Sequence, residues 1–81
     1  MSYIGKNIRK IRMSKKLTQT EFADLFDLKR TAVGSYEEGR AEPKIDTLIK
    51  IADYFSLSLD QLLRKELTIN EIFHFKENLL K

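Results

Sequence analysis

Apolar residues recur at helical spacing in several short stretches of the chain, and this pattern predicts an all-α fold. Near the N-terminus, a helix from about residue 4 to 13 places Ile4, Ile8 and Ile11 on one face and basic side chains on the other. Residues 45–55 predict a second amphipathic helix, whose core stripe is expected to be Ile45, Leu48, Ile49, Ala52 and Phe55.

Between these helices, residues 17–39 predict two short helices joined by a tight turn. Thr18 and Glu21 have the spacing of a capping box, so the first helix begins there and ends near residue 26. Its apolar face is expected to consist of Phe22, Leu25 and Phe26. Asp27 follows at the corner, where the left-handed backbone conformation suits Asp better than most residues other than glycine.

The second short helix is expected from about residue 30 to 38, with Gly39 as a C-terminal cap. Val33 and Tyr36 point toward the core, and the opposite face carries Arg30, Thr31, Gly34 and Ser35. Those side chains are short or basic, so this face is suited to close approach by another molecule.

Two further capping boxes predict the helices of the C-terminal part. Ser58 and Gln61 begin a helix whose leucines, Leu59, Leu62 and Leu63, close the core. Thr68 and Glu71 begin the last helix, which carries a broad apolar arc of Ile69, Ile72, Phe73, Phe75, Leu79 and Leu80. This arc either completes the core, pairs with a second copy of the chain or receives another protein.

Four segments in this order, LTQTEFADLF, VGSYEEGR, EPKIDTLIKIADYF and LSLDQLL, resemble the lambda-repressor-like, Cro/C1-type (XRE) helix-turn-helix regulators. The resemblance covers residues 8–63. It implies a compact five-helix DNA-binding domain in residues 1–66, followed in residues 67–81 by an amphipathic helix that dimerises or completes the core. The chain departs from the family at Asp27, where Gly is usual, and at Lys29, where a capping Ser or Thr is usual.

The resemblance also implies the roles of individual residues toward double-stranded DNA. The residues expected to contact base edges in the major groove are Arg30, Thr31 and Ser35. Those expected to contact phosphates are Thr18, Gln19, Lys29, Arg40 and Lys44. Arg12 and Glu37 match a structural ion pair beneath the recognition helix, although Arg12 also fits an exposed base among others. The implied function is a repressor that binds a palindromic operator as a homodimer, with Phe73, Phe75, Leu79 and Leu80 at the dimer interface.

The formal net charge of +3 is unevenly distributed along the chain. Residues 1–20 carry six bases and no acid, residues 21–60 carry five bases and nine acids, and residues 61–81 carry four bases and three acids. A basic segment beside a helix-turn-helix is typical of phosphate binding, and a solvated lysine-rich helix explains it equally well.

Composition limits the number of domains, the groups that the chain could bind and the class of protein. With 81 residues, no Cys and one His, the chain is expected to form one small domain without a disulfide, metal site, cofactor or small-molecule ligand. It has no recognisable catalytic constellation, signal peptide or membrane span, so we expect a cytoplasmic protein that is not an enzyme. The alternative function is an antitoxin-type interaction module whose C-terminal helix binds a partner protein.

Overall fold

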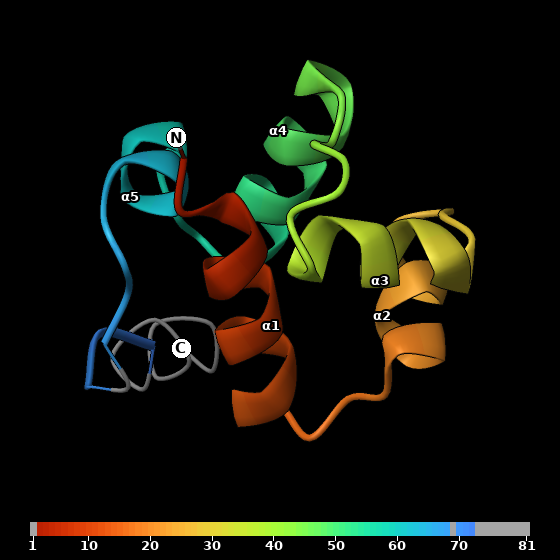
Figure 1. The fold of residues 1–81 in the computed structure, drawn as a ribbon. Helices are drawn as coiled ribbons and strands as arrows, with labels where there is room; N and C mark the ends of the chain where they lie inside the picture. Colours follow the sequence, from red (N-terminus) through yellow and green to blue (C-terminus); the bar gives the residue numbers. More distant parts are fainter. Residues whose placement is uncertain (1, 69, 73–81) are drawn as a thin grey trace.

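The computed structural model of this chain describes residues 2–68 and 70–72. It contains five named helices, α1 (Ile4–Ser14), α2 (Gln19–Leu25), α3 (Arg30–Glu37), α4 (Ile45–Tyr54) and α5 (Leu59–Arg64), and residues 70–72 are also helical. In Figure 1, α1 lies between α5 on one side and the α2–α3 pair on the other. The all-α fold class is confirmed, and the described residues include no strand.

Four of the helices end in the same way, and these ends set the turns of the fold. α3 is followed by Gly39 (φ 77°), as predicted, and Arg40 N–H donates to Ser35 O at 2.9 Å. α1, α2 and α4 are each followed by a non-glycine residue with positive φ, namely Lys16 (58°), Asp27 (56°) and Ser56 (58°). The next residue is a leucine in each case, and its N–H donates back to the helix: Leu17 to Arg12 O (3.0 Å), Leu28 to Ala23 O (2.9 Å) and Leu57 to Ala52 O (2.8 Å). This is the Schellman arrangement, in which the residue after the left-handed one returns to the core. The predicted left-handed conformation of Asp27 is confirmed.

The helix starts follow the predicted capping boxes. Thr18 Oγ1 accepts from Glu21 N–H (3.1 Å), and the Glu21 carboxylate accepts from Thr18 N–H (2.8 Å). Ser58 with Gln61, and Thr68 with Glu71, make the same reciprocal bonds. α3 instead begins after Lys29, which makes no side-chain cap, as the replacement of the usual Ser or Thr by Lys implies.

The core lies where the helices cross. Its aromatic centre comes from α2 and the end of α4, where the Phe22 and Phe26 rings lie 4.9 Å apart and the Phe22 and Phe55 rings 6.2 Å apart. Leu67 and Ile72, which follow α5, are 0% and 4% exposed and belong to the same core. The beginning of the C-terminal segment therefore completes the core of the domain.

A buried amide attaches this C-terminal segment to α1. The Asn7 side chain is fully buried, and its Nδ2 donates to the carbonyls of Leu62 (2.7 Å) and Lys65 (2.9 Å). Its Oδ1 accepts from Leu67 N–H at 2.8 Å. Lys10 adds a bond from Nζ to Leu67 O at 2.9 Å. Asn7 thus satisfies three backbone groups that no helix satisfies.

Four leucines and isoleucines predicted to be buried are exposed instead: Leu25 (41%), Ile45 (69%), Ile49 (41%) and Leu59 (37%). The reason is position along the helix. Ile45 and Leu59 are the first residues of α4 and α5, and Leu25 is the last of α2, so all three lie at helix ends. Ile49 lies one turn after Ile45 on the same edge of α4. The predictions for Ile69, Phe73, His74, Phe75, Leu79 and Leu80 concern residues outside the described part of the chain.

Candidate nucleic-acid interface

The face of α3 that points away from the core is polar and carries small side chains. Thr31 is exposed and Ser35 is half-buried, on the side opposite the fully buried Val33, and Arg30 is exposed at the first position of the helix. An open depression of about 460 Å³ lies along this face. Its walls come from α3, the corner before α3 and the loop before α4, and include Lys29, Thr31, Ser35 and Lys44. Two predicted base readers and two predicted phosphate contacts therefore line one concave surface.

The start of α2 lies close to the middle of α3 at Gly34. A Cβ built on Gly34 would lie 3.7 Å and 3.8 Å from the two polar atoms of the Gln19 amide, which is ordinary van der Waals distance. The Gln19 amide therefore lies beside the polar face of α3, and an alanine at position 34 would also fit there. The predicted phosphate contact Gln19 and the predicted base contact Ser35 come from adjoining parts of the two helices.

The other predicted phosphate contacts surround the same face. Thr18 is exposed at the start of α2, and since its hydroxyl oxygen accepts the capping bond, its O–H proton can still donate outward. Arg40, after α3, is paired with Glu38 at 2.7 Å, and both side chains are more than 60% exposed. An exposed pair of this kind is weak and can be exchanged for a phosphate at little cost.

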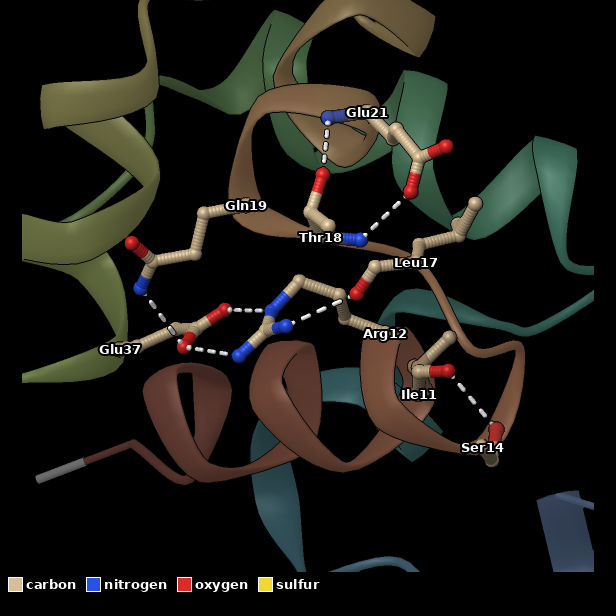
Figure 2. Close-up of polar contacts among 8 residues, drawn as sticks. All are labelled: Ile11, Arg12, Ser14, Leu17, Thr18, Gln19, Glu21 and Glu37. Carbon is tan, nitrogen blue, oxygen red and sulfur yellow. Dashed lines mark hydrogen bonds and ion pairs between the residues drawn. The ribbon is translucent and has the colours of Figure 1, made fainter.

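Beneath α3, a polar network joins the first three helices (Figure 2). Arg12 Nε and Nη2 donate to the two carboxylate oxygens of Glu37 at 2.6 Å and 3.0 Å, and Nη1 donates to Leu17 O at 2.9 Å. The side chains of Arg12 and Glu37 are 14% and 4% exposed. The expected contact between them is thus present, and Arg12 is not the exposed base of the alternative interpretation.

Gln19 belongs to this network, which sequence reasoning did not foresee. Its Nε2 donates to Glu37 Oε1 at 3.2 Å. Because a carboxylate only accepts, this bond fixes which amide atom faces inward and leaves the carbonyl oxygen and the second N–H for other partners. The pairing of Gln19 with Glu37 spans 18 residues, so no local spacing could have indicated it.

Two acids also line the depression, Asp27 and Glu42. Sequence reasoning assigned neither of them to this face, although the excess of acids in residues 21–60 was a signal that some would lie near it. Their negative charge disfavours an anion beside them, unlike the charge of Lys29 and Lys44 on the same surface. Within the described part of the chain, no three His, Cys, Asp or Glu side chains are grouped to hold a metal ion, and no helix is long and apolar enough to cross a membrane.

Comparison with known proteins gives a consistent set of relatives. Residues 8–62 match a protein family described as helix-turn-helix. YqaE of Bacillus subtilis, an uncharacterized HTH-type transcriptional regulator, is 44% identical over 62 residues, which are 76% of this chain and 53% of YqaE. YonR of the same organism, a prophage-derived uncharacterized HTH-type regulator, is 34% identical over 94% of this chain and 73% of its own length.

A solved structure has a similar fold. A transcriptional regulator from Listeria innocua superimposes with a TM-score of 0.75 over 99% of this chain and 75% of that one, at 26% sequence identity. This chain therefore spans about half the length of YqaE and about three quarters of the two other proteins.

Proposed function

Since this chain belongs to the helix-turn-helix family of DNA-binding transcriptional regulators, we propose that it is a repressor that binds a palindromic operator as a homodimer. The observation that carries the proposal is the exposed polar face of α3, backed by the buried Arg12–Glu37 pair. A recognition helix needs such a face toward the bases and a rigid attachment behind it. Repression follows most simply from occupying the operator, in the cytoplasm where bacterial DNA lies.

In the proposed complex, α3 enters the major groove with its N-terminal half toward the base edges. Arg30 is suited to a guanine because its fork of donors matches O6 and N7, and Thr31 and Ser35 offer hydroxyls to either kind of base. Thr18, Gln19, Lys29, Arg40 and Lys44 hold the flanking phosphates, which fix the register of the helix on the duplex.

The homodimer is proposed because one recognition helix reads few base pairs. A two-fold dimer presents two such helices about 34 Å apart, one turn of DNA, and so reads a palindrome. The proposed dimer contacts are Phe73, Phe75, Leu79 and Leu80, which follow the buried Ile72 in sequence. The exposed leucine of α5, Leu59, offers the alternative contact surface on the described part of the chain.

Selection of bound sites from a random DNA pool tests the proposal directly. A palindromic consensus recovered by a dimer in sedimentation is the expected result. Arg30→Ala should cost about 1 to 3 kcal/mol and relax preference at one base pair, whereas Lys44→Ala should weaken all sequences alike and lower the salt slope by about 1. If Arg30→Ala and Thr31→Ala leave site preference unchanged, α3 is not the recognition helix.

Purification from the native source, combined with the same site selection, distinguishes the antitoxin-type alternative from the repressor. A second polypeptide that co-purifies from the native source at fixed stoichiometry, together with no site preference in the purified chain alone, would favour the interaction module. A homodimer that selects a palindrome unaided favours the repressor.

A further inference from the structure

Gly5 lies where the backbones of α1 and α3 touch. It is in the first turn of α1, a position where glycine is a poor helix former compared with alanine. A Cβ built on Gly5 would overlap the carbonyl oxygen of Tyr36, and would lie 3.3 Å from the carbonyl carbon of Tyr36 and 3.4 Å from the carbonyl oxygen of Glu37. The obstacle is backbone, which has no alternative rotamer, so glycine is the residue that permits this approach.

The contact falls on the last turn of α3, which Figure 1 shows beside the N-terminal half of α1. The same turn is held a second time by Arg12, two turns farther along the same face of α1, through the Glu37 carboxylate. The opposite end of α3 is held separately, since the corner before it is closed by the bond from Leu28 N–H to Ala23 O. α3 is therefore fixed at both ends by independent contacts.

We propose that Gly5 is a positioning residue for DNA sequence recognition, because the backbone contact it permits sets the tilt of α3. This inference rests on the proposed function of α3 as the recognition helix. A side chain at position 5 would push the C-terminal end of α3 away from α1 while the corner holds the N-terminal end. α3 is about 12 Å long, so a displacement at one end becomes a tilt across the reading face.

The tilt affects the base readers unequally. Ser35 directly precedes Tyr36 and moves with it, whereas Thr31 lies one turn nearer the fixed corner. Hydrogen bonds to base edges tolerate donor–acceptor distances only within about 0.5 Å. Gly5→Ala should therefore relax preference at the base pair that Ser35 reads before it affects the base pairs read by Arg30 and Thr31.

The test compares site selection and affinity for the wild-type chain, Gly5→Ala, Ser35→Ala and the double variant. Ser35→Ala identifies the base pair concerned, and Gly5→Ala should lower discrimination at that pair about tenfold while non-specific affinity and its salt slope stay unchanged. The double variant should show no further loss at that pair, because both changes remove the same contact.

Leu62→Val is the matched control for lost stability, since Leu62 is fully buried in α5, which packs on α1 and α4. It should lower the melting temperature and leave site preference intact.

If Gly5→Ala does not fold, Arg12→Lys loosens the same end of α3 without steric pressure and should shift preference at the Ser35 base pair. A folded Gly5→Ala or, failing that, Arg12→Lys with wild-type preference overturns the inference. A wild-type chain that selects no site overturns the proposed function itself.

Discussion

The two sides of α1 are held by different chemistry. Toward α2 and α3, Arg12 makes a bidentate ion pair with Glu37 and a bond to Leu17 O. Toward α5 and the C-terminal segment, Asn7 uses a neutral amide to bind three backbone groups. Both anchors are largely withdrawn from water, and no buried side-chain polar atom among the described residues lacks a partner.

The two anchors, the Arg12–Glu37 ion pair and the Asn7 amide, differ in the partners that they require. The charged anchor needs one particular partner residue, so losing either member leaves a charge in a dry site. The amide anchor needs only backbone at the right place, so it fixes the path of residues 62–67 whatever their side chains are. The side that is proposed to read DNA is thus tied by side-chain identity, and the other side by chain geometry.

The largest effect is expected from breaking the charged anchor. Glu37→Ala strands the Arg12 guanidinium, which is 14% exposed, and should destabilise the domain by about 3 to 5 kcal/mol. For a domain of this size each kcal/mol lowers the melting temperature by about 4 to 8 °C, so much of the chain should be unfolded. Arg12→Ala should behave similarly. Glu38→Ala, which removes the neighbouring exposed acid, is the control, and a Glu37→Ala melt within a degree or two of it would contradict the prediction.

The amide anchor should come next. Asn7→Ala leaves Leu62 O and Leu67 N–H without their buried partner, and each such group costs about 1 to 3 kcal/mol, so we expect a loss of about 2 to 6 kcal/mol. Hydrogen exchange at Leu67 N–H should accelerate more than exchange in α3. Equal acceleration in both regions would show that the two sides of α1 are not anchored separately.

Matched substitutions of two capping residues, one on each side of α1, compare the two sides directly. Thr18 caps α2 and Ser58 caps α5 with the same reciprocal bonds, so Thr18→Ala and Ser58→Ala should each cost about 1 kcal/mol in thermal melts. Only Thr18→Ala should also weaken DNA binding, because Thr18 lies beside the proposed phosphate path. Equal DNA affinity in the two variants would remove Thr18 from the interface.

The smallest effect is expected from the exposed pair beside Asn7. The hydrogen bond and charge of Lys10 lower the pKa of Glu66 below its ordinary value of 4.5. A lowered carboxyl pKa contributes stability at neutral pH that is lost as the pH falls from about 4.5 through the folded-state value. Because Glu66 is exposed, Glu66→Gln should change the melting temperature slightly at pH 7 and not at all at pH 2. A difference that persists at pH 2 would mean that the Glu66 effect is not electrostatic.

The sequence predicted the helices well because their signals are local. The capping boxes at Thr18 and Ser58 and the corner at Asp27 involve residues within a few positions of each other, and all are present. The anchors differ. The Arg12–Glu37 contact was expected through the family resemblance, but Asn7 was overlooked, although its place among Ile4, Ile8 and Ile11 marked it as a polar residue on an apolar stripe.

Exposure was the least predictable property. Ile45, Ile49 and Leu59 continue apolar stripes that periodicity assigns to the core, yet they remain partly in water. Whether such a residue is covered depends on where a neighbouring helix crosses, which contacts between residues far apart in the sequence decide. Periodicity gives the side of a helix and carries no information on the point of crossing.

The left-handed corners have a consequence for how this protein can evolve. A non-glycine residue at such a corner costs about 1 to 2 kcal/mol in sterics, and glycine costs about 0.4 to 1 kcal/mol more in unfolded-chain entropy, so the second cost offsets only part of the first. Asp27 occupies one of these corners and also lines the depression beside Lys29. Asp and Asn tolerate the left-handed conformation better than other non-glycine residues, so Asp27→Asn would remove the charge at the edge of the depression at a smaller backbone cost than other non-glycine exchanges.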